Sequence, residues 1–495
     1  MKKAEKNAPA LPGVVLLAAG LGKRMRSSLP KVMQEIAGKP LIFHVLSQIK
    51  EVNKNIPIAL VVGYGREKVE TYLKSEEALS DLDLTLIVQD EQKGTGHAAR
   101  CAVESDWGRQ RVAEGSSILV LPGDLPLLRP ELIQRMLEPL KKLEKVRVLA
   151  CELSDPTGYG RIVRSSATQE VIKIVEEKDA SEKQKRIKEV GTSIYLFESQ
   201  FLQSSVKKLA PNNAQGEYYL TDLILMASQS SKGSARVTSV LWSEERDLRG
   251  VNDPWELSIA REIFNERLIQ FWAKKGVQFL KSNTVHLDVE VALSENVVIY
   301  PGVVLTGRTE IAQGVTLGAH VVLSNVRVGE GSTIKTGTVA ENAQVGSKVS
   351  IGPYAHLRPE SNVGDRCKIG NFVELKKTQV QENTSIAHLS YLGDAQVGKN
   401  VNIGCGFVTC NYDGREIQGQ RKHQTIIEDD VFLGSACQAV APVRIGQGAY
   451  VGSGSTITEN VEPHALAIAR ARQVNKPGYA EKIRAKRNKE EDFSI

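Results

Sequence analysis

Two different hydrophobic periods divide the chain near residue 275. Before that point, short apolar runs alternate with amphipathic segments, a pattern typical of strands and helices that follow one another along the chain. The expected strands cover residues 14–18, 58–62, 84–88, 117–121 and 146–150, and a helix is expected over 41–50. This alternation predicts a Rossmann-like α/β domain with a mostly parallel sheet covered on both faces. Sites in such sheets lie at the carboxyl ends of the strands.

After residue 275, aliphatic residues recur at intervals of six. No helical period explains this spacing, whereas six-residue repeats are the signature of a parallel β-helix, in which three hexads close one triangular coil and the aliphatic side chain points inward. Scattered strands of a β-sandwich are the alternative. The series are Val285, Val291, Val297, Val303; Ile311, Leu317, Leu323; Val345, Ile351, Leu357; Val363, Ile369, Leu375; Val380, Ile386, Leu392; Val397, Ile403; and Ile445, Val451, Ile457.

These periods divide the chain into four parts. We expect an α/β domain over 1–252, a linker helix over 253–275, a β-helix domain over 276–475 and a basic tail over 476–495. Pro254 suits the first turn of the linker helix and Gly276 its end. The period breaks at 409–425, which predicts an inserted polar loop containing Arg415, Arg421, Lys422 and His423. The tail is either a solvated or disordered end or a weak contact for polyanions.

Composition narrows the class of protein. The chain has 495 residues, 41% hydrophobic and 25% charged, which is ordinary for a globular protein and excludes a disordered, collagen-like or multi-span membrane chain. The net charge of +6 is too small for a nucleic-acid footprint over the whole protein. The six cysteines contain no CxxC pair, so we expect reduced thiols in a cytoplasmic protein. Lys2, Lys3 and Lys6 before the apolar stretch 11–19 imitate a signal peptide, which stays an alternative.

A glycine-rich turn follows the first expected strand. Gly20 and Gly22 allow backbone N–H groups to approach phosphate, and Arg24 and Lys31 add positive charge suited to a triphosphate. The spacing is neither a Walker P-loop nor a dinucleotide-binding fingerprint.

Three further loops carry candidate chemistry. Asp124 comes directly after the strand 117–121, where a carboxylate holds Mg²⁺ on a nucleotide or merely caps a turn. The polar loop 89–97 offers amides that could read a base edge, or is an ordinary turn. Segments 156–161 and 174–178 are equally open by themselves.

Several of these segments together carry a family resemblance. The L-x-x-G-x-G-x-R-M…P-K pattern over 17–31 resembles the signature of sugar-1-phosphate nucleotidyltransferases. With 89–96, 123–127, 156–161, 213–219, 250–252 and the hexapeptide repeats, residues 13–475 resemble the bacterial bifunctional N-acetylglucosamine-1-phosphate uridylyltransferase/glucosamine-1-phosphate N-acetyltransferases. The resemblance implies a left-handed β-helix and synthesis of UDP-N-acetylglucosamine, a cell-wall precursor. Acetyl transfer from acetyl-CoA would come first, and uridylyl transfer from UTP would follow.

The resemblance implies roles in the first half. Lys31 and Arg24 would stabilise charge on the phosphates, while Asp124 and Asn252 would hold Mg²⁺. The sugar phosphate would attack the α-phosphate of UTP in line, so positioning and charge neutralisation carry the reaction. The nucleotide and sugar contacts would be Leu17, Ala18, Ala19, Gly20, Gln89, Gly94, Thr95, Gly123, Gly160 and Glu176.

His388 is the candidate general base of the second half. A neutral imidazole suits deprotonation of an amine, although a lone histidine is more often structural. Glu374 and Lys376 lie one expected coil earlier, close enough to stack beside it. The resemblance implies that His388 is the base and that Glu374 orients it. It also implies sugar-phosphate contacts by Arg358, Lys376, Tyr391, Asn402, Asn411 and Tyr412, and acetyl-CoA contacts by Cys405, Ser435, Ser453 and Arg470.

The family would act as a homotrimer, with each acetyl-transfer site built between neighbouring chains. This sequence departs from the family pattern at three places. Lys23 replaces Thr, Gly191-Thr192-Ser193 stands where the family has Asn-Thr-Gly with the Asn contacting the sugar, and Cys405 replaces Ala. A nucleophilic Cys405 or Cys410 is a further alternative for the acetyl transfer. Two other interpretations of the whole chain remain: a single-activity nucleotidyltransferase with an oligomerising or regulatory β-helix, and a non-enzymatic regulatory subunit.

Overall fold

The computed structural model describes residues 10–20, 22–229, 236–414, 416 and 421–491. The chain forms two compact units, Met1–Leu268 and Ile269–Ile495. Predictions that involved Lys2, Lys3, Lys6, Leu21 and Arg415 lie outside the described residues.

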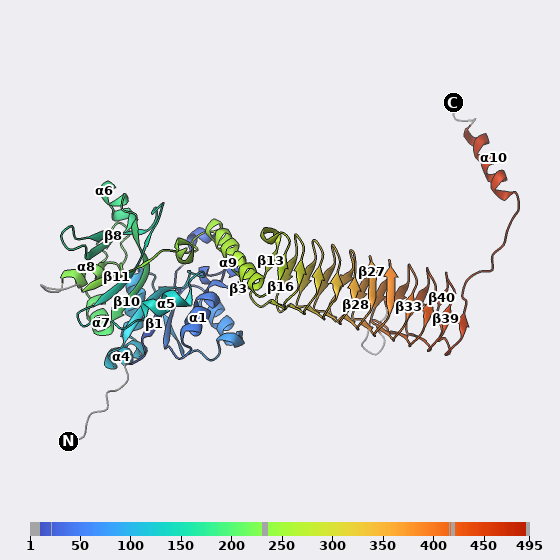
Figure 1. Cartoon of the computed structure of the whole chain (residues 1–495), viewed down its shortest axis with the longest axis horizontal. Helices are drawn as coiled ribbons and strands as arrows, with labels where there is room; N and C mark the ends of the chain where they lie inside the picture. The colour runs from blue at the N-terminus through green and yellow to red at the C-terminus, as the bar shows by residue number, and fades with distance from the viewer. Residues whose placement is uncertain (1–9, 21, 230–235, 415, 417–420, 492–495) are drawn as a thin grey trace, which may run out of the picture. The chain divides into compact units, whose positions relative to one another are not determined.

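The first unit is built on a mixed sheet in the order β11-β7-β10-β6-β1-β4-β5 (Figure 1). Adjacent strands are parallel except around β10, which is antiparallel to both β6 and β7. An antiparallel pair, β8 and β9, extends from β10. The mostly parallel sheet is therefore confirmed. The strands are β1 (Gly13–Leu17), β4 (Ile58–Val62), β5 (Leu84–Val88), β6 (Ser117–Pro122), β7 (Val146–Glu152), β8 (Gly160–Arg164), β9 (Val171–Val175), β10 (Glu189–Glu198) and β11 (Val237–Trp242).

Helices cover both faces of this sheet. Val14, Val15 and Leu16 of the central strand β1 are all fully buried, and consecutive strand residues point to opposite faces. The apolar stretch 11–19, which also imitates a signal peptide, thus supplies the centre of the sheet. The helices are α1 (Leu41–Val52), α2 (Arg66–Ser75), α3 (Thr95–Glu104), α4 (Asp106–Ala113), α5 (Pro130–Met136), α6 (Glu182–Lys185), α7 (Ser199–Val206) and α8 (Asp222–Gln229).

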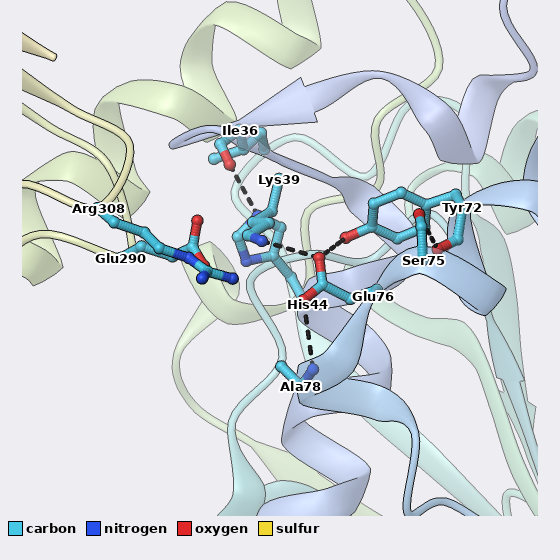
Figure 2. A network of polar contacts seen from close by, with 9 residues as sticks. All are labelled: Ile36, Lys39, His44, Tyr72, Ser75, Glu76, Ala78, Glu290 and Arg308. Atoms are coloured by element: carbon cyan, nitrogen blue, oxygen red, sulfur yellow. Dashed lines mark hydrogen bonds and ion pairs between the residues drawn. The ribbon is translucent and has the colours of Figure 1, made fainter. Parts of the chain in front are cut away.

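A buried polar network fixes the hairpin of β2 (Glu35–Ile36) and β3 (Lys39–Pro40) (Figure 2). The Lys39 ammonium donates to Glu76 at the end of α2 (2.8 Å), and the Tyr72 hydroxyl donates to the same carboxylate (2.9 Å). His44 Nε2 of α1 lies 2.8 Å from the Ile36 carbonyl oxygen and donates to it. Burial lowers the pKa of His44 from 6.5 to about 4, so the imidazole is neutral at pH 7. The network thus holds the β2–β3 hairpin, which follows Lys31 in the chain, against helices α1 and α2.

Helix α9 (Pro254–Lys274) confirms the expected linker helix. It begins at Pro254, and Gly276 beyond its end has a φ of 93°. Its portion within the first unit is anchored by Arg267, which contacts the buried Asp247 carboxylate (2.5 Å) and the Leu127 carbonyl oxygen (2.7 Å). Asp247 also accepts from Trp242 and pairs with Arg129. This helix therefore stabilises the loop that follows β6.

The second unit is a left-handed β-helix of three parallel sheets, seen in Figure 1 as a stack of similar coils. Most strands pair with one that lies 17 or 18 residues later, as Val298 does with Thr316 and Thr316 with Thr333. The sheets run from β12 (Gln278–Phe279) to β41 (Leu466–Ala467), from β13 (His286–Leu287) to β40 (Thr456–Ile457), and from β14 (Ala292–Leu293) to β38 (Val443–Ile445). The sandwich alternative is wrong.

Every aliphatic residue of the six-residue series is buried, but each hexad buries two residues rather than one. Val291 and Val297 are buried, and so are Leu293 and Ile299, two positions later. Residues two apart in a strand share a face, so both point into the coil. The predicted series therefore marks the first of the two buried residues of each hexad up to Val303, and the second of the two from Ile311 onward.

The inserted loop is confirmed between β34 (Val408–Cys410) and β35 (Thr425–Ile427). Ala395 lies opposite Thr425, 30 residues later, instead of the usual 17 or 18. The tail contains α10 (Tyr479–Glu491), whose side chains up to Arg487 are exposed. All six cysteines are free thiols. Across the described residues, no helix is both long enough and apolar enough to span a membrane.

Candidate active sites

The first candidate site lies where neighbouring parallel strands end. Gly123 N donates to Leu17 O, Ala18 N to Val61 O, and Gln89 N to Val62 O, each at 2.8 Å. These bonds bring the loops after β1, β4, β5 and β6 to one edge of the sheet. The predicted residues Leu17, Ala18, Ala19, Gly20, Gln89, Gly123 and Asp124 are therefore brought together.

The glycine-rich turn passes close to Lys31. Gly22 has a φ of 58°, and a Cβ built on it would lie 2.9 Å from the Lys31 Cβ. Glycine at this position therefore allows both the left-handed conformation and the close approach. Arg24 lies in the short helix η1 (Lys23–Met25) and is exposed.

Lys31, Asp124 and Asn252 converge, although they lie far apart in the sequence. The Lys31 ammonium forms an ion pair with Asp124 and donates to Asn252 Oδ1 (2.8 Å). Asn252 is held in turn: its N–H donates to Glu256 Oε2 of α9 (2.6 Å), and Val251 N donates to Asp124 O (3.0 Å). The Asp124 carboxylate and the Asn252 side-chain oxygen thus both face the Lys31 ammonium.

This donor set fits Mg²⁺. The ion takes a carboxylate and other oxygen ligands and keeps several sites for water and phosphate oxygens. No cluster of three or more His, Cys, Asp or Glu side chains that could hold a metal occurs among the residues the structure describes. The protein can therefore supply two ligands here, from Asp124 and Asn252, and a bound nucleotide would supply others.

Two cavities lie near Gln89, which lines the first of them. One, of about 410 Å³, is lined by residues after β4 and β5, including Gly63, Tyr64, Gln89 and Gln92. The other, of about 300 Å³, is lined by residues along α3, from Gly96 to Glu104, and by Tyr218. Gln89 itself is only 3% exposed.

Gly94 and Thr95 contact the segment that precedes α8. A Cβ on Gly94 would lie 2.8 Å from Tyr218 O, and Thr95 Oγ1 accepts from Leu220 N (3.3 Å). These contacts hold the start of α3 against residues 218–220. The predicted base contacts of Gly94 and Thr95 thus come with a packing role that the sequence did not indicate.

The candidate sugar contacts gather around Ile174. A Cβ on Gly160 would lie 2.7 Å from Ile174 Cγ2 and 3.5 Å from Glu176 Oε2, and one on Gly191 would lie 2.9 Å from Ile174 Cδ1. Gly191 lies opposite Gly160 in the β10–β8 pair. Burial raises the pKa of Glu176, although Thr221 Oγ1 donates to it (3.1 Å). Any side chain at 191 would require Ile174 to move.

His388 ends β30 (Ser385–His388) and is exposed. Its Nδ1 lies 2.8 Å from Asn371 Oδ1, and Asn371 lies directly opposite it in β27 (Lys368–Asn371). A carbonyl oxygen only accepts, so Nδ1 carries the proton and Nε2 keeps a lone pair. The ring is therefore oriented as a proton acceptor.

Glu374 does not contact His388, so the expectation that it orients the imidazole is wrong. Glu374, in β28 (Glu374–Lys376), lies opposite Tyr391 of β31 (Tyr391–Gly393) and pairs with Arg358 (3.0 Å). The sequence suggested that Glu374 lies beside His388 because it belongs to the preceding coil. The chain turns a corner of the β-helix between Asn371 and Glu374, so Glu374 and His388 belong to different sheets. Asn371, which lies opposite His388 in the preceding coil, contacts the imidazole instead, and the sequence did not predict this role.

Three basic side chains, Arg358, Lys376 and Lys422, lie close together in the second unit. The Lys422 ammonium next to Lys376 lowers the pKa of Lys376, and Arg358 acts in the same direction. Asn411 Nδ2 donates to Asp394 Oδ2 (2.6 Å), while the neighbouring Tyr412 is exposed. Paired cations of this kind suit a phosphate. Lys422 was predicted only as part of a basic loop.

The candidate acetyl-CoA contacts continue the corner occupied by His388. Ser385, Asn402, Phe432 and Tyr450 pair in succession from coil to coil. Three residues after each of them come His388, Cys405, Ser435 and Ser453, which therefore occupy the same corner of successive coils. Ala436 N donates to Cys405 O (2.7 Å), and Gly454 N donates to Ser435 O (2.9 Å). A Cβ on Gly454 would lie 3.7 Å from Arg470 Cδ. The four residues thus form one column along the β-helix.

Known protein families match both units. The MobA-like NTP transferase domain matches residues 14–187. Bacterial transferase hexapeptide repeats match residues 342–377, and the hexapeptide repeat of succinyl-transferase matches 424–459. Fold and sites together define a transferase with two active sites, a nucleotidyltransferase joined to an acyltransferase.

Relatives match the chain over almost its whole length. Bifunctional protein GlmU of Carboxydothermus hydrogenoformans is 42% identical over 468 residues, which cover 94% of this chain and 99% of that protein. Those of Halalkalibacterium halodurans (40% over 469 residues; 94% and 98%) and Trichlorobacter lovleyi (40% over 476 residues; 96% and 99%) are similar. The chain therefore belongs to the family of bifunctional GlmU proteins. The single-activity and regulatory-subunit alternatives do not account for this match.

Proposed function

We propose that this bifunctional enzyme makes UDP-N-acetylglucosamine in two steps, with acetyl transfer in residues 276–475 and uridylyl transfer in residues 1–252. The observation that carries the proposal is that one chain holds two separate sets of groups. Lys31, Asp124 and Asn252 suit a nucleotide with its metal, and His388 with Asn371 suits removal of a proton from an amine. Nucleotides and sugar phosphates are accordingly the substrate classes.

In the first step, His388 Nε2 accepts a proton as the amine of glucosamine-1-phosphate attacks the acetyl carbonyl carbon of acetyl-CoA. The new C–N bond forms, the C–S bond breaks, and the CoA thiolate leaves and takes up a proton. Asn371 keeps the imidazole in the required tautomer. The attack is direct, without an acyl-enzyme.

Substrate binding in this step is assigned to the surrounding polar groups. Arg358 and Lys376 would bind the phosphate, with Tyr391, Asn402, Asn411 and Tyr412 around the sugar. The column of Cys405, Ser435, Ser453 and Arg470 would carry the coenzyme along the corner of the β-helix. Lys422 is added to the phosphate site because it lies beside Lys376.

In the second step, a phosphate oxygen of N-acetylglucosamine-1-phosphate attacks the α-phosphorus of UTP, and pyrophosphate leaves. Lys31 and Arg24 neutralise the phosphate charge, and the turn over 17–20 with Gln89, Gly94, Thr95 and Gly123 would hold the nucleoside. Asp124 and Asn252 would hold Mg²⁺, which supplies charge neutralisation on the phosphates. Gly160 and Glu176 would contact the sugar.

We also propose a homotrimer in the cytoplasm. Tyr354 and Phe372 stack on successive coils with ring centroids 5.7 Å apart, and Leu389 follows one coil later. All three are more than half exposed. This apolar column suits burial against a second β-helix beside His388. Six free thiols, and substrates that include UTP and acetyl-CoA, support a cytoplasmic location.

A split assay on the purified full-length protein tests the proposal. One reaction contains acetyl-CoA and glucosamine-1-phosphate, with free CoA thiol as the readout. The other contains UTP, Mg²⁺ and N-acetylglucosamine-1-phosphate, with pyrophosphate as the readout. We expect activity in both. Pyrophosphate alone would return the chain to the single-activity interpretation, and CoA alone would show that Gly191 has changed the sugar accepted by the first site.

A further inference from the structure

We propose that His97 is a positioning residue that fixes the orientation of the Gln89 side-chain amide and thereby makes the base pocket select uracil over cytosine. This inference rests on the proposed uridylyl transfer, in which Gln89 reads the base. His97 carries no role in the mechanism described above. It lies in the first turn of α3, where its imidazole contacts the Gln89 side-chain amide.

The amide nitrogen of Gln89 has two neighbours within the protein. Nε2 lies 2.9 Å from His97 Nδ1 and 3.4 Å from the carbonyl oxygen of Gly94. The carbonyl oxygen can only accept, so the NH₂ end of the amide faces it. The same end faces His97, and Nδ1 must therefore be the acceptor of this bond. The imidazole proton consequently sits on Nε2.

The far side of the imidazole agrees with this tautomer. His97 Nε2 lies 4.0 Å from Cys101 Sγ, one helical turn along α3, at the wall of the 300 Å³ cavity. A thiol sulfur is a weak acceptor, so an N–H directed at it is compatible. The Tyr218 ring lies beside the imidazole, with centroids 6.3 Å apart. His97 is thus held between Gln89, Cys101 and Tyr218.

This arrangement decides what Gln89 offers to a base. Both N–H bonds of its amide are directed at His97 and Gly94, which leaves Oε1 as the group for a ligand. Uracil presents a donor at N3, which an amide oxygen accepts. Cytosine presents a lone pair at the same position, which faces that oxygen unfavourably. Without the Nδ1 acceptor, the amide could turn and offer its NH₂ group to cytosine.

Two variants of nearly equal shape isolate this effect. His97→Asn keeps an acceptor, because the asparagine Oδ1 takes the place of Nδ1. His97→Leu keeps the volume and removes the acceptor. Cys101→Ala is the matched control within α3, since it removes the sulfur and leaves Nδ1 unchanged. Thermal unfolding of the first unit, which contains His97, is followed by circular dichroism and reports whether each full-length variant is folded.

The measurement is the KM and kcat of pyrophosphate release with UTP and with CTP, together with calorimetric binding of both nucleotides in Mg²⁺. We expect His97→Leu to reduce the preference for UTP about tenfold, mainly through KM, because a polar site rejects the wrong base only while its groups are fixed. His97→Asn and Cys101→Ala should stay within about threefold of the wild-type preference.

Unchanged selectivity in His97→Leu would overturn the inference. If His97→Leu does not fold, His97→Asn decides: wild-type selectivity supports the inference, and its collapse overturns it. If the wild-type protein releases no pyrophosphate, the proposed function fails, but the comparison of UTP and CTP binding still tests the role of His97.

Discussion

The two sites of this protein are assembled in different ways. In the first unit, Lys31, Asp124 and Asn252 come from three distant segments, and their meeting depends on the strand order of the sheet and on α9. In the second unit, Asn371, His388 and Cys405 occupy equivalent positions of successive coils. The sheet site is therefore set by topology, whereas the β-helix site is set by repeat length.

The difference has consequences for robustness. Inserting residues in a loop of the first unit changes one edge of the site. Changing the length of one coil in the second unit would shift every later member of the column. The inserted segment after Cys410 leaves the coil at one corner and returns at Thr425, so the strands on either side stay paired. Insertions that keep strand register are thus compatible with the column.

One of the two largest expected effects is on the sheet site alone. Asp124→Ala removes one of two oxygen ligands and the partner of Lys31, so uridylyl transfer should fall by about 10³-fold. CoA release by the same protein should be unchanged. Loss of both activities would mean that the two units do not work separately.

The reciprocal change affects the β-helix site alone. His388→Ala removes the proton acceptor, and acetyl transfer should fall by about 10²–10⁴-fold, the usual contribution of a general base. Pyrophosphate release should be unchanged. Retention of acetyl transfer would remove His388 from the mechanism and reopen the cysteine alternative, which Cys405→Ser and Cys410→Ser would then test.

Acid should destabilise the first unit through His44. The unfolded chain binds a proton at His44 near pH 6.5, whereas the folded chain does so only near pH 4, because the side chain is buried. Its contribution to stability is full above pH 6.5 and is lost as the pH falls toward 4, by about 3 kcal/mol.

The measurement for this prediction is the free energy of unfolding of the first unit between pH 7 and pH 4. His44→Gln, which keeps a donor for Ile36 and does not titrate, should flatten the dependence over this range. An equally steep dependence in that variant would assign the acid sensitivity to other groups.

The smallest effect distinguishes the two candidates for orienting His388. Asn371→Ala should lower kcat of acetyl transfer about tenfold with little change in KM, because it frees the imidazole tautomer without removing the base. Glu374→Gln should act mainly on KM for glucosamine-1-phosphate, through Arg358. The reverse pattern would restore Glu374 as the orienting residue.

The sequence predicted those features that depend on local pattern. Strands β4 and β5 were predicted with their observed ends, and the hexads marked buried positions throughout the β-helix. The antiparallel strand β10 was not predicted, because Gly191 and Ser193 interrupt its pattern and Ser193 adopts a φ of 62°. Its pairing with β6 and β7 depends on residues far away in the chain.

The roles of single polar residues were harder to predict. The resemblance pointed to His388, Lys31 and Asp124 but paired His388 with Glu374, because sequence distance does not show where the coil turns a corner. Asn371 was detectable only from its 17-residue separation from His388. His97 gave no signal, because its partner Gln89 lies across a turn and the contact depends on how α3 begins.

A complementation assay tests most directly the claim that one chain holds two separate sites. Asp124→Ala and His388→Ala proteins are purified separately and supplied with glucosamine-1-phosphate, acetyl-CoA, UTP and Mg²⁺, with UDP-N-acetylglucosamine as the readout. We predict little product from either protein alone and wild-type-like product from the mixture, because the acetylated intermediate diffuses from one site to the other. A mixture that makes no product, although both proteins are folded, would contradict the account.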